Sequence, residues 1–85
     1  MKLFYFTAAW CQPCKVFGPI MEKIGTDYTV EKIDIEQDMN TATILDVQSV
    51  PTVVIFEQNT GTEVGRFVGA RTENWVRDFL KEAAA

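Results

Sequence analysis

Apolar side chains recur along the chain in two rhythms, one typical of β-strands and the other typical of helices. Dense β-branched and aromatic side chains predict strands over residues 2–7, 29–35, 52–56 and 63–68. Apolar side chains at steps of three and four predict helices over residues 11–24, 40–47 and 73–81. The third strand segment is apolar without interruption, so we expect it to be buried on both faces of a sheet.

Capping residues mark the ends of the predicted helices. Gly25 is a typical helix stop, and Thr72 is a typical N-cap for the last helix. Asp38 and Asn40 are alternative caps for the short middle helix. Pro19 lies inside the first helix and predicts a kink there.

Two further segments complete the expected layout. The turn residues Asn59-Thr60-Gly61 join the last two strands as a hairpin. Trp75 shares one face of the last helix with other apolar side chains, which predicts that it is a core residue.

The order of elements is strand, helix, strand, helix, strand, strand, helix. A right-handed crossover makes the first two strands parallel, and the hairpin adds an antiparallel edge. The sequence therefore predicts one α/β domain over residues 1–85, with a four-stranded mixed sheet and three helices covering both faces. Functional sites in such sheets gather beyond the carboxyl ends of strands. Residues 8–14 follow the first strand at that edge.

Composition and charge narrow the possible partners. With 85 residues, 47% of them apolar, the chain is long enough for one modest core and too short for two. Its net charge of −4 and the absence of a Lys or Arg cluster argue against nucleic acid as a partner. No apolar run reaches the ~18–20 residues that span a bilayer, so no membrane segment is expected.

The first residues superficially resemble a secretion signal, because a lysine precedes a short apolar run. Removal of that run would take a whole hydrophobic strand from a small chain. We therefore expect the segment to be part of the fold and the protein to be cytoplasmic.

The chain has two cysteines, spaced Cys11-Gln12-Pro13-Cys14. A bridge across two residues closes a very small loop and stabilises a fold little, so redox chemistry explains the pair better than a structural role does. If Cys11 begins the helix, the two Cα atoms lie about 5–6 Å apart, within disulfide range. The spacing therefore suits both a dithiol and a disulfide.

The helix start also favours the reactive form of a cysteine. A free thiol, with a pKa near 8.5, is only about 3% ionised at pH 7, and the thiolate is the nucleophile. Unpaired amides at a helix N-terminus stabilise such an anion, and Pro13 suits the first helical turn. The first cysteine of such a pair is normally the exposed one. We therefore assign Cys11 as the attacking nucleophile and Cys14 as the resolving thiol.

Two other classes of function remain open at this point. Two thiols supply half of a structural zinc site, and the chain has no histidine, so a metal-binding module is weakly supported and no metal is expected. An interaction module that grips a partner without cycling its cysteines is the other alternative. Reduction of insulin, compared with a Cys11→Ser variant, separates that module from an enzyme.

Four landmarks in order resemble the thioredoxin family. Trp10-Cys11-Gln12-Pro13-Cys14-Lys15 is similar to its active-site motif, and Pro19 to its helix-kinking proline. Val50-Pro51-Thr52 resembles its cis-proline loop, and Val68-Gly69-Ala70 its glycine-containing loop. The resemblance covers nearly the whole chain from Leu3 onward and implies a thioredoxin-like fold.

The resemblance implies a protein-disulfide reductase with Cys11 and Cys14 as its redox pair. It implies a cis peptide bond between Val50 and Pro51 and strand-like pairing of the backbone at Val50 with an extended substrate. The contact surface would consist of Trp10, Gln12, Pro13, Val50, Pro51, Gly69 and Ala70.

The sequence departs from the family pattern in three places. It lacks the first strand and helix, so it resembles a minimal thioredoxin or a glutaredoxin-like protein. Gln12 replaces the usual glycine of the motif, a position that tunes redox potential. Tyr5 stands at the position of the family's buried aspartate, with Lys32 at its accompanying lysine. Proton transfer from Cys14 is therefore assigned either to a water molecule or to Tyr5 and Lys32 together.

The resemblance also implies the partners. We expect a monomer that binds no cofactor and receives electrons from NADPH through a flavin-dependent thioredoxin reductase. Its substrates would be disulfide-containing proteins, ribonucleotide reductase among them. A glutaredoxin-like donor to ribonucleotide reductase, reduced by glutathione, is the alternative. The Trp10 and Gln12-Pro13 pattern favours a thioredoxin, and the short N-terminus favours a glutaredoxin-like protein.

Overall fold

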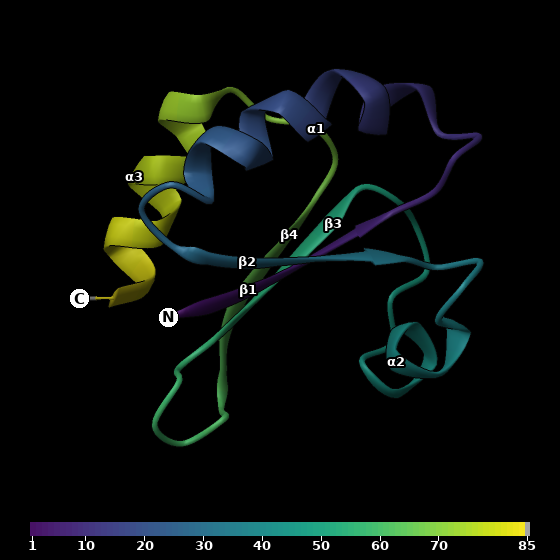
Figure 1. Cartoon of the computed structure of the whole chain (residues 1–85). Helices are drawn as coiled ribbons and strands as arrows, with labels where there is room; N and C mark the ends of the chain where they lie inside the picture. Colours follow the sequence, from purple (N-terminus) through teal and green to yellow (C-terminus); the bar gives the residue numbers. More distant parts are fainter. Residues whose placement is uncertain (85) are drawn as a thin grey trace.

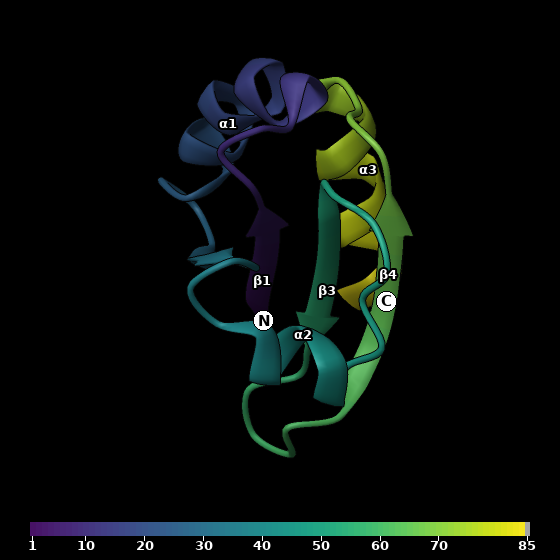
Figure 2. The same ribbon diagram turned by 90° about the vertical axis from the view of Figure 1, so that its right-hand side faces the viewer.

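A computed structural model describes residues 1–84 as one mixed sheet flanked by three helices (Figures 1 and 2). The elements in chain order are β1 (Lys2–Thr7), α1 (Gln12–Ile24), β2 (Thr29–Asp34), α2 (Met39–Ile44), β3 (Thr52–Phe56), β4 (Glu63–Val68) and α3 (Glu73–Ala84). The strand order in the sheet is β2-β1-β3-β4, so β1 and β3 are central. This arrangement confirms the predicted α/β fold class and element order.

The register of the sheet follows from the crossover and the hairpin. β1 is parallel to β2, with Phe6 opposite Ile33, and antiparallel to β3, with Phe6 opposite Thr52. β3 is antiparallel to β4, and Gly61 in the connecting turn has a positive φ of 71°. A left-handed conformation is one that glycine adopts without a Cβ penalty, which explains why the turn is placed there.

Helices cover both faces of the sheet. α1 and α3 lie on one face and α2 lies on the other (Figure 2). Side chains alternate between the faces, so Val53 and Ile55 of β3 point into the larger core while Val54 points into the smaller one. All three are fully buried, which confirms the prediction of a strand buried on both faces.

The helix ends agree with the capping signals, with one exception. Cys11 is the N-cap of α1, and the Thr72 hydroxyl accepts the amide of Trp75 at 3.2 Å to cap α3. Asp38 caps α2, which decides between the two alternative caps. The predicted end of α2 at Val47 was wrong, because the helix ends at Ile44 and the chain then turns through Asp46 at φ 56°. Pro19 lies inside α1 as expected, and the kink stays a prediction.

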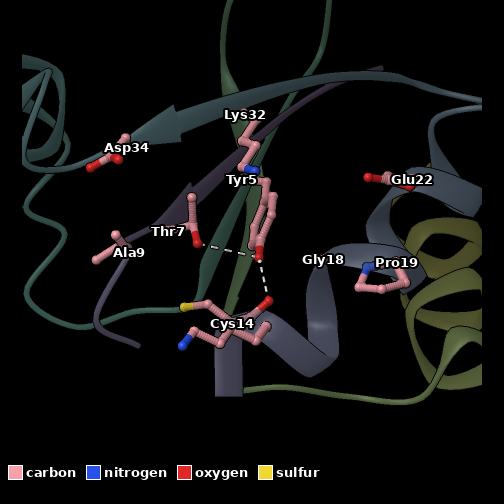
Figure 3. A pocket seen from close by; sticks show the side chains of 11 residues that line it. Tyr5, Thr7, Ala9, Cys14, Gly18, Pro19, Glu22, Lys32 and Asp34 are labelled. Carbon is pink, nitrogen blue, oxygen red and sulfur yellow. Dashed lines mark hydrogen bonds between the residues drawn. The ribbon is translucent and has the colours of Figure 1, made fainter. Parts of the chain in front are cut away.

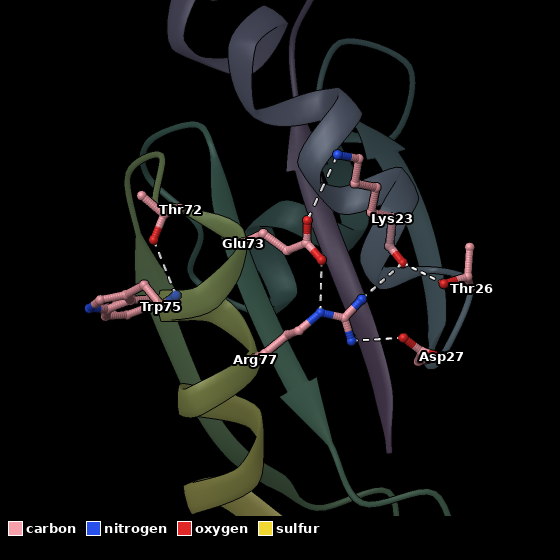
Figure 4. A network of polar contacts seen from close by, with 7 residues as sticks. All are labelled: Lys23, Thr26, Asp27, Thr72, Glu73, Trp75 and Arg77. Atoms are coloured by element: carbon pink, nitrogen blue, oxygen red, sulfur yellow. Dashed lines mark hydrogen bonds and ion pairs between the residues drawn. The ribbon is translucent and has the colours of Figure 1, made fainter.

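A polar network ties α1 to α3 (Figure 4). Arg77 of α3 donates to Glu73 one turn earlier and to Asp27, which follows α1. Its guanidinium also donates to the Lys23 carbonyl at the end of α1, at 3.4 Å. Lys23 lies 4.0 Å from Glu73. These contacts join the C-terminal end of α1 and the segment after it to the first turns of α3.

The prediction that Trp75 is a core residue was wrong. Its side chain is 39% exposed, whereas Val76 and Leu80 of the same helix are fully buried. The apolar stripe of α3 is wider than the part that contacts the sheet, so Trp75 lies at its edge and stacks on Phe79 at 5.2 Å.

No helix within residues 1–84 combines the length and apolar character needed to cross a membrane.

Candidate active site

Cys11 and Cys14 lie where β1 gives way to α1, beyond the carboxyl end of a central strand. The chain leaves β1 at Thr7, and the Cys11 amide donates to the Ala8 carbonyl at 3.2 Å, which closes a tight turn before the helix. The two Cα atoms are 5.3 Å apart and the sulfurs are bonded. The structure therefore holds the oxidised pair at the spacing that the sequence predicts.

The Cys11 sulfur occupies the capping position of α1. Its Sγ accepts the backbone N–H of Cys14 at 3.3 Å and lies 3.7 Å from the Val50 carbonyl oxygen. No acidic residue occurs in the first turn of α1. An anion at this sulfur would therefore receive a backbone N–H and the positive end of the helix dipole.

Exposure does not distinguish the two cysteines. Both are 4% exposed in the oxidised structure, contrary to the expectation that Cys11 is the exposed one. They are packed against Ala8 and against the half-buried Ile35 and Val50. The difference between the sulfurs lies in the cap, because the Cys14 amide is directed at Cys11 alone.

Two loops from distant parts of the chain meet beside the bridge. The Val50–Pro51 peptide bond is cis, as the resemblance implies. Pro51 accepts the Gly69 amide at 2.8 Å, and Gly69 has a φ of 95°, a conformation that favours glycine. This hydrogen bond fixes the loop after β4, including Ala70, next to the loop before β3.

The remaining predicted contact residues surround the helix start. Trp10 is 64% exposed, and Gln12 and Pro13 are also exposed. They belong to the segment that carries the cysteines, whereas Val50 and Gly69 come from the loops beside it. Together these parts form a surface around the buried sulfur pair.

A pocket of about 430 Å³ lies behind Cys14 (Figure 3). Tyr5 stands in its centre, 2% exposed, and its hydroxyl donates to the Cys14 carbonyl at 3.2 Å. Lys32 faces it from β2 as the direct register partner of Tyr5 and also lines the pocket. Within residues 1–84, the Lys32 side chain makes no ion pair. The structure thus brings Tyr5 to the resolving cysteine and leaves Lys32 at the pocket wall.

Thr7 is a neighbour of the site that sequence reasoning missed. It is buried, lines the pocket, and its Oγ1 lies 3.5 Å from the Tyr5 hydroxyl. Its position as the last residue of β1, two residues after Tyr5 and on the same side of the strand, is the signal that could have identified it.

Within residues 1–84, no group of three or more His, Cys, Asp or Glu side chains comes together in a way that would hold a metal ion.

Comparison with known proteins adds an independent line of evidence. The thioredoxin family model matches residues 1–82. A thioredoxin of Buchnera aphidicola from Acyrthosiphon pisum is 37% identical over 81 residues, which cover 91% of this chain and 73% of that protein. A thioredoxin of Mycolicibacterium smegmatis is 44% identical over 72 residues, covering 78% of this chain and 62% of that protein. A thioredoxin of Staphylococcus haemolyticus is 36% identical over 84 residues, covering 94% and 79%.

The similarity to thioredoxins agrees with the structure of this chain, in which the two cysteines are joined by a disulfide at the first turn of a helix. Thiol–disulfide exchange is the chemistry that such a pair performs, and it requires no bound cofactor. The chain belongs to the thioredoxin family of thiol–disulfide oxidoreductases.

Proposed function

We propose that the protein reduces disulfides in other proteins, with Cys11 as the attacking thiolate and Cys14 as the resolving thiol. The observation that carries this assignment is the 3.3 Å contact from the Cys14 amide to the Cys11 sulfur. An amide aimed at one of two equally buried sulfurs selects which one is stabilised as an anion.

The reaction has two exchange steps. The Cys11 thiolate attacks one sulfur of the substrate disulfide, that S–S bond breaks, and the other substrate sulfur leaves as a thiolate that takes up a proton. Cys14 then loses its proton and attacks the Cys11 sulfur of the mixed disulfide, which releases the second substrate thiolate. Two electrons pass to the substrate, and the protein is left with the Cys11–Cys14 bond.

The surface around the bridge suits an extended substrate segment. The Val50 backbone lies beside the Cys11 sulfur, so a strand paired with that backbone would place its own sulfur within reach. On the helix side, such a substrate segment would be bordered by the exposed residues Trp10, Gln12 and Pro13. Pro51, Gly69 and Ala70 border it on the other side.

Insulin reduction tests the assignment of the two cysteines. Cys11→Ser is expected to abolish turnover, because no thiolate remains at the helix cap. Cys14→Ser is expected to complete the first exchange and accumulate a mixed disulfide that mass spectrometry detects. An exposed variant remote from the bridge, Ile44→Ser, serves as the control. Continued turnover by Cys14→Ser, or alkylation of the reduced Cys11 no faster than that of an unstructured peptide, would contradict the proposal.

The proton of Cys14 must leave before the second step, and we propose that it passes to water in the pocket, with the Tyr5 hydroxyl relaying it by taking up that proton as it releases its own. Its hydroxyl is buried, contacts the Cys14 backbone and lies near Thr7, in a pocket large enough to hold water. Lys32 contributes a positive charge at the wall of the same pocket.

Stopped-flow kinetics with a substrate that reports both steps tests the Tyr5 assignment. Tyr5→Phe is expected to slow resolution of the mixed disulfide about tenfold, a small general acid–base effect, and to leave the first attack unchanged. The pH dependence of the rate of the second step should also differ between Tyr5→Phe and the wild type. Lys32→Met is expected to have a smaller effect on the same step. Resolution at the wild-type rate in Tyr5→Phe would leave water as the proton acceptor.

We propose that the electrons come from NADPH and reach the protein through a flavoprotein thioredoxin reductase. A lone Cys-x-x-Cys pair fits a reducing compartment, so we place this monomeric carrier in the cytoplasm, with ribonucleotide reductase as one candidate substrate. Incubation of the oxidised protein with NADPH and thioredoxin reductase should reduce it faster than glutathione does. Faster reduction by glutathione would favour the glutaredoxin-like alternative.

A further inference from the structure

A second hollow lies between α1 and the start of α3, on the side of the molecule away from the Tyr5 pocket. Its volume is about 410 Å³, enough for one bulky side chain of a partner. We call it the α1–α3 groove, and it is lined by Val16, Ile20, Ala70, Arg71, Thr72 and Trp75.

The walls of the groove are apolar and open to solvent. Val16 is 69% exposed and Trp75 is 39% exposed, while Ile20, one helical turn after Val16, is half-buried. Single exposed apolar side chains are ordinary on protein surfaces. Here they converge from two helices on one hollow, an arrangement suited to binding an apolar side chain.

The aromatic wall is fixed before any ligand arrives. The Trp75 ring stacks on Phe79 at 5.2 Å and meets Phe67 edge-on at 5.0 Å. Its backbone is held by the Thr72 hydroxyl, which accepts the Trp75 amide (Figure 4). A rigid ring loses little conformational freedom on binding, so the groove is preorganised.

A cation without a carboxylate partner within residues 1–84 stands at the rim. The Arg71 guanidinium lies over the Trp75 ring at 5.0 Å and donates to its neighbour's carbonyl, Ala70, at 3.3 Å. No carboxylate of residues 1–84 forms an ion pair with it, whereas Arg66 and Arg77 each bind one or more carboxylates. The rim is therefore complementary to a carboxylate supplied from outside.

The groove is continuous with the surface around the bridge. Ala70 lines the groove and directly follows Gly69, whose amide binds the Pro51 carbonyl. Val16 lies two residues after Cys14 on α1. A polypeptide whose cysteine reaches Cys11 can therefore extend past Ala70 into the groove.

We infer that the α1–α3 groove selects protein substrates in which a bulky apolar residue next to an acidic residue lies a few residues from the attacked cysteine. The apolar side chain would fill the space between Val16, Ile20 and Trp75, and the carboxylate would pair with Arg71. This inference rests on the proposed reduction of protein disulfides and adds a substrate class to it.

Matched peptides test the inference. The probes are disulfide-closed peptides of one length, carrying Leu-Asp two, three or four residues before or after the attacked cysteine, with Leu-Asn and Ser-Asp counterparts. At one spacing, kcat/KM for Leu-Asp should exceed that for Ser-Asp about tenfold, the effect of burying a leucine. It should exceed that for Leu-Asn about threefold, the effect of a solvent-exposed ion pair. Equal values at every spacing would overturn the inference.

Variants assign the two preferences to the groove. Val16→Ser should abolish the leucine preference, and Arg71→Gln should abolish the aspartate preference. Two exposed controls away from the groove, Ile44→Ser and Lys81→Gln, should keep both. Preferences that persist in Val16→Ser and Arg71→Gln would place the selection elsewhere and overturn the inference.

Two readouts separate this inference from its rivals. All rates are divided by those for hydroxyethyl disulfide, which has no side chain to fill the groove. Failure of the wild type to reduce insulin would defeat the proposed function itself, and not the groove alone. Sedimentation equilibrium tests a second copy of the chain as the occupant. Dimerisation of the wild type that is lost in Val16→Ser would overturn the inference in favour of self-association.

Discussion

The sheet face under α1 and α3 buries a large apolar cluster, including Phe17, Met21 and Leu80, whereas the face under α2 carries a smaller one built on Phe6 and Val54. The first face is also clamped from outside by the Arg77 network. The second is left partly open. It has a hollow of about 570 Å³ lined in part by the half-buried Phe4 and Phe56, and Ile44 is 81% exposed there.

The difference separates the parts of the active site. The cysteines begin α1, whose later residues Phe17 and Met21 are anchored in the large cluster, while the two sulfurs themselves pack against Ile35 and Val50 beside the smaller cluster. Val50 packs against the smaller cluster and follows α2, so the loop that would receive the substrate belongs to the lightly packed side. A helix anchored in the large cluster beside a lightly packed loop would combine a well-placed sulfur with a surface that can adapt to different protein substrates.

Large-to-small substitutions should give the largest test of this contrast. Phe17 is fully buried and meets Tyr5 and Phe67 edge-on, so Phe17→Ala should lower the free energy of unfolding by about 3–5 kcal/mol. Phe56→Ala, on the open face, removes a half-buried ring and should lower it by about 1–2 kcal/mol. Urea unfolding of the oxidised proteins measures both. Equal losses of unfolding free energy in the two variants would show that the two faces of the sheet contribute equally to stability.

A cap on the firmly held side gives a smaller effect. Thr72→Ala removes the hydroxyl that accepts the Trp75 amide, and should lower the free energy of unfolding by about 1 kcal/mol. Hydrogen exchange should accelerate in the first turn of α3 and not in α2. Thr72→Ser keeps an accepting hydroxyl and is the matched control, so a loss in it equal to that of Thr72→Ala would argue against the cap.

Local signals predicted the elements, and tertiary packing decided what they left open. The rhythm of apolar positions and the caps at Thr72 and Gly25 predicted where α1 and α3 lie. The same rhythm overestimated the burial of Trp75, because a helix pattern does not say how wide a strip the sheet covers. The length of α2 was overestimated because Asp46 takes a left-handed conformation that its residue type permits but does not require.

The site divides in the same way. The spacing of Cys11 and Cys14 determines their Cα separation, since both lie in one helical turn. The hydrogen bond from Gly69 to Pro51 joins segments far apart in the chain; the family resemblance placed both segments at the active site but did not predict this bond. The equal burial of the two sulfurs and the place of Thr7 depend on how β1 meets α1, which no local pattern encodes.

Removal of the α1–α3 clamp should have a smaller, salt-dependent effect. Arg77→Gln breaks the ion pairs with Glu73 and Asp27 and the contact with the Lys23 carbonyl. Solvent-exposed pairs are individually weak and are screened by salt, so the loss of stability should be below that of Thr72→Ala and should shrink in 1 M NaCl, where the Debye length is about 3 Å. Arg66→Gln breaks the ion pair with Glu63 inside β4, so it is the control for losing a surface ion pair that does not join two helices. A loss in Arg77→Gln that salt does not reduce would point to packing by the arginine stem.

The smallest effect should come from the cap on the open face, and it should depend on pH. Asp38 accepts the Thr41 hydroxyl at 2.7 Å and the Thr41 amide at 3.1 Å. These two hydrogen bonds, of which the one from the hydroxyl has the larger effect, hold the pKa of Asp38 below its ordinary 3.8. The ionised form is thus favoured by folding, so its contribution is fully present above the unfolded pKa and is lost as the pH falls through the lower folded pKa. Hydrogen exchange in α2 should accelerate as the pH falls below 3.8, relative to an Asp38→Asn variant in which no carboxylate titrates. The same pH dependence in both proteins would show that other carboxylates control α2, and that the open face is not held by this cap.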